Sequence, residues 1–339
     1  NTPDTSQLSR RWDVQPTTIR RATLAGLCAR LASGRAVSGE LAVAAMLALI
    51  VNLSVNAEAI AEGAQKSGGG SNLDDVGKKL ANPLTDLWAL NFNSFVPGFF
   101  DGDVNKGDAK LGATTIFQPI LPIPLTGEGA DEFRVILRPV VPIVWSTPIP
   151  DGFDEFNHKT GIGDIQLPFV FSVPDSIAGK WILGAGPVFE FPTATDDALG
   201  ADQWSAGPAI AVGHKGEKLT SVLFFNYFWN IGGADQGDKP DTDKGSLLYS
   251  LQYALGNGWQ VGTNPNITYN DNASSGNKWN VPIGAFIGRT VKFGKTAINF
   301  KLGVEYSVVS PDDFGQEAAI RLQVTPIIPG LIKKPLFGG

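Results

Sequence analysis

The feature that most constrains this sequence is a strict alternation of apolar and polar side chains over long segments. Along one of them Ile298, Phe300, Leu302, Val304, Tyr306 and Val308 alternate with Asn299, Lys301, Gly303, Glu305 and Ser307. The segments 246–255 and 318–325 repeat the pattern. A period of two places the apolar side chains on one face of a β-strand and the polar ones on the other. The alternation therefore predicts a chain built mainly from amphipathic strands.

Segment length and aromatic placement separate two kinds of β protein. A soluble sandwich packs its apolar faces together, whereas an outer-membrane barrel turns them to lipid. Soluble strands average about five or six residues, but a tilted strand needs about ten to cross a bilayer. Tryptophans also lie near segment ends, as an interfacial girdle requires: Trp88, Trp145, Trp181, Trp204, Trp229, Trp259 and Trp279. We therefore predict an all-β, transmembrane, antiparallel up-and-down β-barrel, with a soluble sandwich as the alternative.

Composition excludes several other classes. The chain is 43% hydrophobic and 18% charged, yet no stretch approaches the ~20 apolar residues of a transmembrane helix. A net charge of −6 argues against a nucleic-acid partner. The single cysteine, Cys28, excludes an intrachain disulfide.

The region before the first strand is predicted to direct export. Arginines precede an apolar run at 41–51, and Ala57-Glu58-Ala59 follows it, the order of a secretory signal peptide. We expect a leader over 1–59, a periplasmic linker with a short helix over 60–82, and the barrel over 83–339. The helix, over 73–81, has acidic residues early and lysines late, which suits its dipole. It is a candidate plug for the periplasmic mouth.

The alternation and the turn residues together predict about twelve strands. They lie near 84–96, 111–123, 132–147, 163–173, 180–192, 203–213, 218–231, 246–255, 258–270, 278–292, 295–309 and 317–328. Short turns and long loops alternate between them, so the short turns are predicted to face the periplasm and the long loops the outside.

Several segments resemble a known family. They are GPVFEFPTATDDALG at 186–200, WSAGP at 204–208, GIGDIQ at 161–166, WNVPI at 279–283 and ANPLTDL at 81–87. Together they resemble the family named for the MetA pathway of phenol degradation, whose bacterial members are often mislabelled neuromedin U. The resemblance covers essentially all of 80–328. It implies a barrel in the bacterial outer membrane that passes small hydrophobic or aromatic molecules, and it brings no catalytic residues.

The predicted surroundings follow from that location. They are outer-membrane lipid and lipopolysaccharide, a small-molecule solute and the barrel-assembly machinery. The chain departs from many barrels at its end, because Pro326 and Pro329 interrupt the last strand and Gly338-Gly339 replace a final aromatic residue.

Function is expected in the lumen, where the polar faces point. The residues predicted to line the pore are Arg134, Arg138, Asp164, Gln166, Glu190, Asn226, Asn264, Asn266, Lys301, Glu305, Arg321 and Gln323. They would either set the selectivity of a channel or fill a plugged structural or adhesion barrel. A barrel enzyme is the third alternative, with His158 as its candidate. The sequence predicts no catalytic, metal or cofactor site.

One contact is predicted in detail. Centring the last loop near Asp313 sets Glu305 opposite Arg321 and Gly303 opposite Gln323 on neighbouring strands. Both charged residues share the inward parity of their strands, so an ion pair within the lumen is expected.

Overall fold

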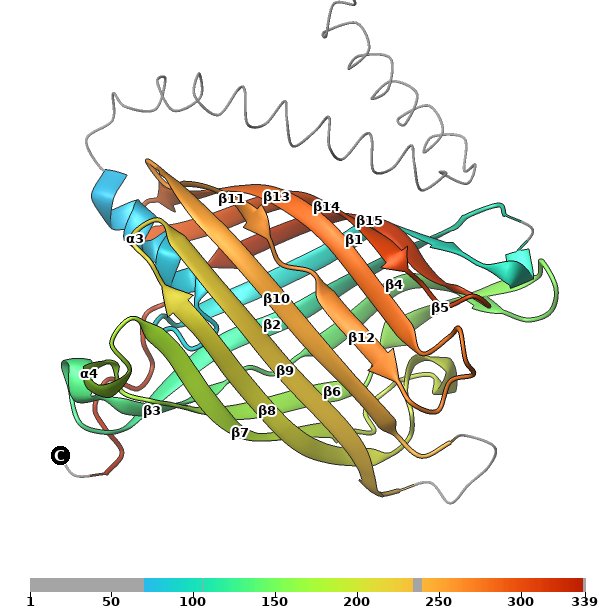
Figure 1. Cartoon of the computed structure of the whole chain (residues 1–339), viewed down its shortest axis with the longest axis horizontal. Coiled ribbons are helices and arrows are strands. Elements are labelled where there is room, and N and C mark those ends of the chain that lie inside the picture. Colours follow the sequence, from blue (N-terminus) through green and yellow to red (C-terminus); the bar gives the residue numbers. More distant parts are fainter. Residues whose placement is uncertain (1–69, 106, 234–239, 338–339) are drawn as a thin grey trace, which may run out of the picture.

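The computed structural model describes residues 70–337, apart from 106 and 234–239, and forms one closed sheet (Figure 1). Its strands are β1 (Ala89–Asp101), β2 (Lys110–Thr126), β3 (Phe133–Leu137), β4 (Val141–Pro150), β5 (Phe156–Ile162), β6 (Ile165–Ser172), β7 (Trp181–Phe191), β8 (Trp204–Lys215), β9 (Leu219–Gly232), β10 (Asp243–Gly256), β11 (Trp259–Thr263), β12 (Asn266–Asn270), β13 (Trp279–Phe293), β14 (Thr296–Val309) and β15 (Gly315–Pro326). Because β1 pairs antiparallel with both β2 and β15, the sheet has no free edge there and the barrel is closed.

The predicted twelve-stranded antiparallel barrel is confirmed, although three of its strands are broken. The breaks separate β3 from β4 at 138–140, β5 from β6 at 163–164, and β11 from β12 at 264–265. Pro139 and Pro265 lie in two of them, and proline has no N–H to give to the ladder. At the β3–β4 and β11–β12 breaks both halves still pair with strands on both sides, so the wall continues past the break. At the third break β6 pairs with β3 and β7, whereas β5 pairs with β4.

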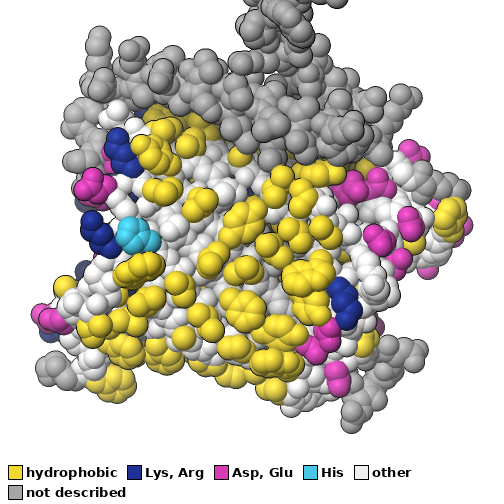
Figure 2. Space-filling model, in the orientation of Figure 1, with side chains coloured by type: hydrophobic (Ala, Val, Ile, Leu, Met, Phe, Trp, Pro, Cys, Tyr) yellow, Lys and Arg dark blue, Asp and Glu magenta, His cyan; other side chains and the backbone are white. Residues whose placement is uncertain are grey.

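The outside of the barrel is apolar in its middle. Leu223, Leu251 and Leu302 project from it with about half of their surface exposed (52%, 47% and 54%). Figure 2 shows hydrophobic side chains covering the middle of one face, with charged groups gathered at its ends. Such a belt of exposed apolar side chains is what the hydrocarbon layer of a membrane requires. Among the described residues, no helix is long and apolar enough to cross a membrane.

Tryptophans lie on the outer surface near both ends of the barrel. Trp145, Trp204, Trp229 and Trp279 are exposed near the long-loop end, and Trp181 is exposed near the other. Trp88 was predicted to join them but is only 8% exposed. Its carbonyl accepts a hydrogen bond from Ile328 N–H, because the chain after β15 folds back over it.

The two ends of the barrel differ as predicted. The short-turn end carries the helices α3 (Gly70–Ala81) and α4 (Asp175–Ala178), the turn η3 (Gly129–Asp131) and the end of the chain (Figure 1). By the rule for such barrels this end faces the periplasm, and we call it the periplasmic mouth. The long-loop end carries η2 (Asp103–Asn105) and η4 (Asp197–Leu199).

In one of the loops at this end, Lys278 donates a hydrogen bond to Asp271 and thereby lowers the pKa of that carboxyl.

Candidate functional site in the barrel lumen

The inside of the barrel has two chemically different walls. We call apolar wall the cluster formed by Leu84, Ala89, Ile120, Ile136, Val170, Ile182, Val188, Ala209, Ala211, Val222, Phe224 and Phe228. We call polar wall the buried or half-buried set Asn91, Asn93, Gln252, Gln260, Thr290, Asn299, Lys301, Glu305, Arg321, Gln323 and Thr325. The apolar wall lies mainly on β3 and β6–β9, and the polar wall on β1, β10, β11 and β13–β15. The lumen is therefore amphipathic across its width.

Local sequence explains the apolar wall. In 133–137, 167–171 and 181–191 apolar residues occupy both faces of the strand, so the inward face is apolar as well as the lipid-facing one. Strands that are apolar on both faces are typical of sheets covered on both sides. Val188 and Ile136 are fully buried in the interior (0% exposed), whereas Trp181, on the same strand as Val188, is exposed on the outside.

Arg321 ties four strands together in the polar wall. Its Nη1 lies 2.6 Å from Glu305 Oε1 and donates to the Asn264 carbonyl oxygen (2.8 Å). Its Nε donates to Asn93 Oδ1 (2.7 Å), and its guanidinium lies over the Phe95 ring. Asn264 stands in the break between β11 and β12. Because Arg321 comes from β15, it reaches past β14 and β13 to hold that break.

The predicted Glu305–Arg321 ion pair is thus confirmed, but the predicted register is wrong. Glu305 lies opposite Ala319, Gly303 opposite Arg321, and Lys301 opposite Gln323. Compared with the prediction, each residue of β14 lies opposite a residue two positions earlier on β15. The prediction centred the loop on Asp313, but contacts with neighbouring loops hold the loop 310–314 in a different position. Asp103 N–H and Asn277 Oδ1 both bind it. The ion pair is diagonal, and the long arginine side chain spans the offset.

Lys301 lies in a buried layer of amides. Its Nζ donates to Gln252 Oε1 (3.0 Å) and lies 4.5 Å from the centroid of the Phe286 ring. Gln252 Nε2 donates in turn to Gln260 Oε1 (2.6 Å) and to the Gly77 carbonyl of α3. Gln260 Nε2 has no partner. Gln323, the neighbour of Lys301 on β15, donates to Thr325 Oγ1 (3.2 Å).

A second charged group lies toward the loop end. Glu190 is 1% exposed and its carboxylate accepts from Gln166 Nε2 (2.8 Å) and lies 2.8 Å from Lys244 Nζ. Asn226 faces inward between Ala209 and Ser246, and its Oδ1 is buried without a partner. Asn266 pairs with Leu248, whose side chain packs on the apolar wall. Unlike the other candidates, Asn266 is exposed.

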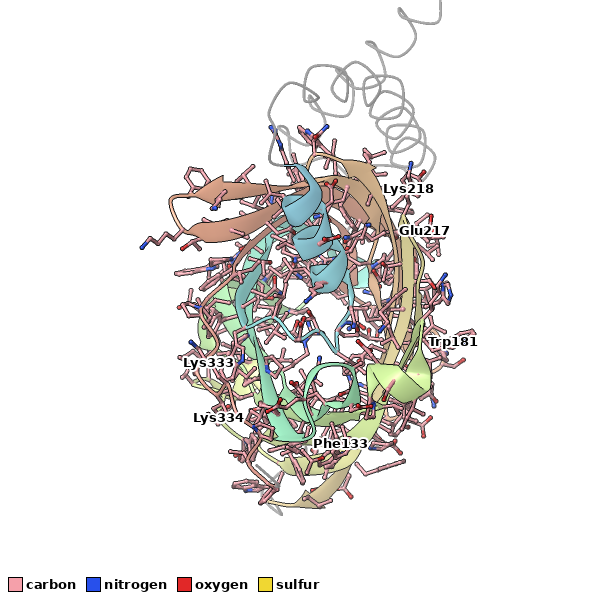
Figure 3. All side chains as sticks on the ribbon, turned by 90° about the vertical axis from the view of Figure 1, so that its left-hand side faces the viewer. Phe133, Trp181, Glu217, Lys218, Lys333 and Lys334 are labelled. Atoms are coloured by element: carbon pink, nitrogen blue, oxygen red, sulfur yellow. The ribbon has the colours of Figure 1, made fainter. Side chains whose placement is uncertain are left out.

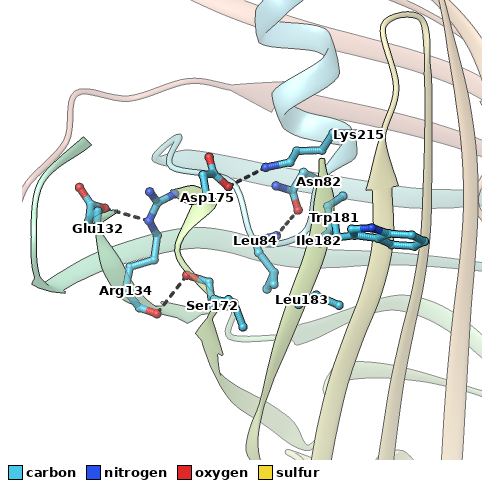
Figure 4. A pocket seen from close by; sticks show the side chains of 11 residues that line it. Asn82, Leu84, Glu132, Arg134, Ser172, Asp175, Trp181, Ile182, Leu183 and Lys215 are labelled. Atoms are coloured by element: carbon cyan, nitrogen blue, oxygen red, sulfur yellow. Dashed lines mark hydrogen bonds and ion pairs between the residues drawn. The ribbon is translucent and has the colours of Figure 1, made fainter. Parts of the chain in front are cut away.

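Arg138 and Arg134 lie nearer the periplasmic mouth. Arg138 stands in the break between β3 and β4, and its Nη2 donates to Gln118 Oε1 (3.2 Å). Arg134 pairs with Glu132 (Nε to Oε1, 2.8 Å) and lines a small pocket with Asp175 and Lys215, which form a second ion pair. Figure 4 shows these two ion pairs around the pocket, with Leu84 and Ile182 beside them.

Asp164 has a different role from the pore lining that was predicted for it. Its carboxylate accepts three backbone hydrogen bonds, from Thr193 and Ala194 (both 3.1 Å) and from Ala201 (2.6 Å). In addition, Thr195 Oγ1 accepts from Ile162 N–H (3.0 Å). The GIGD and PTAT segments, far apart in sequence, therefore bind each other and fix the β7–β8 loop at the outer end of the barrel.

Helix α3 lies in the periplasmic mouth, within the ring of strands that Figure 3 shows from that end. It packs on β9, β10, β11, β13 and β14. Asp74 accepts hydrogen bonds from the backbone of Asn257 and Gly258 in the β10–β11 turn. At Gly77 a Cβ would lie 3.0 Å from Gln260 Oε1 and 3.2 Å from Thr290 Oγ1. The helix predicted over 73–81 is present but begins at Gly70. It packs on the buried layer of amides that contains Lys301.

Two groups of lumen residues were missed by the sequence reasoning. The first is the apolar wall, which a count of apolar residues on both strand faces would have found. The second is the glutamines that hold the buried cations, Gln118 and Gln252. Strand parity places Gln252 on the inward face. Its contact with Lys301, however, joins β10 to β14 past β11 and β13, and alternation along single strands does not predict which inward side chains meet across such a distance.

The part of the chain that the structure describes contains no group of three histidine, cysteine or acidic residues placed to hold a metal. Ser146 Oγ lies 2.8 Å from His158 Nδ1 on the exposed surface of β4 and β5. Within the described residues, no contact orients the other imidazole nitrogen of His158, which a catalytic triad requires.

Comparisons with known proteins agree with this architecture. The chain is 15% identical to an outer membrane channel from Pseudomonas putida F1, with a TM-score of 0.53 over 73% of this chain and 97% of that one. It is 12% identical to the toluene transporter TodX of Pseudomonas putida (TM-score 0.36; 74% and 93% covered). It is 11% identical to outer membrane phospholipase A from Escherichia coli (TM-score 0.36; 76% and 99% covered). At 15% identity, the likeness to the Pseudomonas putida F1 channel shows the fold alone.

No curated protein sequence matches the chain. A family described as "Putative MetA-pathway of phenol degradation" matches residues 95–320, which include β2–β14 and the GIGD and PTAT segments. That match spans more than half of the sequence. The resemblance expected from the sequence is therefore confirmed, and the chain belongs to this family.

Proposed function

We propose that this protein is an outer-membrane channel for small molecules with an apolar body. The apolar wall is the observation that carries the proposal. A barrel interior is ordinarily polar, yet here a cluster of buried apolar side chains packs inside the barrel opposite the polar wall. A solute with a hydrophobic or aromatic part would replace contacts within this cluster as it passes, while its polar groups exchange hydrogen bonds with the polar wall. The family's connection with phenol degradation supports the same class of solute.

The predicted pore-lining residues take specific parts in this proposal. Arg321, Glu305 and Asn264 narrow the middle of the lumen, and Lys301, Gln323 and Arg138 present polar groups on either side of it. Glu190, Gln166, Asn226 and Asn266 lie on the path toward the outer loops, and Arg134 lies at the periplasmic exit. Asp164 acts by holding a loop and has no contact with the solute.

The channel we propose is closed at the periplasmic mouth by α3 and conducts when this helix shifts. Around Gly77 the contacts of α3 are polar, and Gln260 Nε2 beneath it has no partner, whereas Leu80 packs on the apolar wall. When the helix leaves, water satisfies the polar groups around Gly77. This supports a movable plug over a permanent one.

Planar-bilayer recordings of the purified full chain test the proposal. Gly77→Leu places a side chain against Gln260 and Thr290, so it should unseat α3 and raise the single-channel conductance. Asp75→Leu is the matched control, because it adds the same side chain on the exposed face of the helix. If neither the unmodified chain nor Gly77→Leu conducts ions, the channel is rejected in favour of a plugged structural or adhesion barrel.

A barrel hydrolase is the second candidate, favoured only by the Ser146–His158 contact. We propose that this pair is a surface hydrogen bond without catalytic function. The test compares ester and phospholipid hydrolysis by the unmodified chain and Ser146→Ala in detergent micelles. Hydrolysis that disappears in Ser146→Ala would establish the enzyme.

The remaining proposals concern export and surroundings. We infer a signal peptide within 1–59 and a linker after it, both outside the described residues. Assembly by the barrel-assembly machinery and contact of the outer leaflet with lipopolysaccharide follow from the proposed location. N-terminal sequencing of protein extracted from membranes should begin near Ile60; a start well before residue 50 would contradict the leader.

A further inference from the structure

Two cations inside the barrel differ from the others in their partners. Arg134, Lys244 and Arg321 each have a carboxylate oxygen within 2.8 Å. Arg138 instead contacts the Gln118 amide oxygen, and Lys301 contacts the Gln252 amide oxygen. Among the described residues, no ion pair involves either of these two side chains.

Their burial makes this arrangement costly. Lys301 is 7% exposed, and the Nε of Arg138 is buried without a hydrogen-bond partner. Removing a cation from water costs several kcal/mol unless a counter-ion compensates. Ionisable residues kept inside a membrane protein at that cost mark a path or a site for a charged ligand.

Both cations also stand at borders of the apolar wall. Arg138 comes two residues after Ile136, on the same chain segment, and Gln118 comes two residues before Ile120. On the other side, Gln252 shares the inward face of β10 with Leu248, which packs on the apolar wall. Each border therefore offers a cation, an amide and an adjoining apolar surface.

We propose that the lumen binds and passes small organic anions, with Lys301 and Arg138 holding the anionic group and the apolar wall holding the hydrocarbon part. This inference rests on the proposed channel function and names its substrate class: aromatic or short aliphatic carboxylates. At Lys301 the anion accepts from Nζ and from Gln260 Nε2, the donor that has no partner in this structure. Helix α3 covers this layer, so an anion reaches Lys301 once α3 is displaced.

The test measures how benzoate blocks the chloride current in planar bilayers. Benzyl alcohol, which has the same aromatic ring but no charge, is the comparison compound. Unmodified chain and the Gly77→Leu variant are both used. Benzoate should block at far lower concentrations than benzyl alcohol. Lys301→Met and Arg138→Met, each in the Gly77→Leu background, should raise the half-blocking concentration of benzoate about tenfold, the effect of one lost hydrogen bond to a charged group. Lys301→Arg should keep the block.

Lys295→Met is the matched control, because it removes a lysine from the exposed turn between β13 and β14. It should leave the block unchanged. Correct folding of every variant is verified by its faster migration in SDS before boiling. Equal block by benzoate and benzyl alcohol, or an unchanged half-blocking concentration in conducting Lys301→Met and Arg138→Met channels, overturns the anion proposal and leaves the channel standing. Absence of current in both the unmodified chain and Gly77→Leu overturns the channel itself, and the anion proposal with it.

Discussion

At the scale of single residues, Glu305 and Arg321 contribute unequally to stability although they form one ion pair. Without Glu305, Arg321 keeps Asn93 and Asn264 as acceptors. Without Arg321, Glu305 is a buried carboxylate with no other ion pair among the described residues. Glu305→Gln should therefore destabilise the barrel by about 1 kcal/mol, and Arg321→Met by about 3–5 kcal/mol. Both losses are measured by titrating each variant with urea in lipid vesicles and following the fraction that migrates as the folded band. Equal losses would contradict the asymmetry.

Asp164 offers a second residue-scale prediction, at the loop end. Its carboxylate receives three backbone N–H groups of the β7–β8 loop. Asp164→Ala leaves them without that acceptor, so the 191–204 loop should be cleaved faster by added protease and the barrel should lose about 2–3 kcal/mol. Asp108→Ala removes an exposed carboxylate from another outer loop and should change neither quantity. Equal protease sensitivity of the two variants would show that Asp164 does not hold the loop.

At the scale of the strand, adjacent residues of β9 face different media. Phe224 belongs to the apolar wall and is 6% exposed, whereas Leu223 faces outward and is 52% exposed. Phe224→Ala should cost about 3–5 kcal/mol by leaving a cavity. Leu223→Ala removes contacts with lipid only and should cost far less. Urea titration in vesicles compares the two; a larger loss for Leu223→Ala would mean that the facing of β9 is reversed.

Strands also show what the sequence can and cannot predict here. Alternation along β10, β14 and β15 specifies their inward faces, because one residue of slippage would turn every apolar side chain inward. The closed barrel and the inward facing of Lys301, Glu305 and Arg321 followed from that alone. Alternation does not predict the apolar wall, because there both faces of the strand are apolar. It also does not detect a register shift of two residues, because such a shift keeps each residue on its face. That is why Glu305 was set opposite Arg321 when it lies opposite Ala319.

At the scale of the whole molecule, stability depends on closure of the sheet by β1 and β15. Phe92 pairs with Val324 and Ser94 with Leu322 along this seam, so the first and last strands of the described chain protect each other's edges. A closed barrel has no edge from which to unravel. The folded chain should therefore resist SDS at room temperature and migrate faster than the boiled chain. Leu322→Pro removes an N–H from a strand that has partners on both sides and should abolish the fast band. Val309→Pro, at the last residue of β14, introduces the same residue where the ladder ends and should keep most of it. If both variants lost the fast-migrating band, or if neither did, resistance to SDS would not depend on the pairing of β1 with β15.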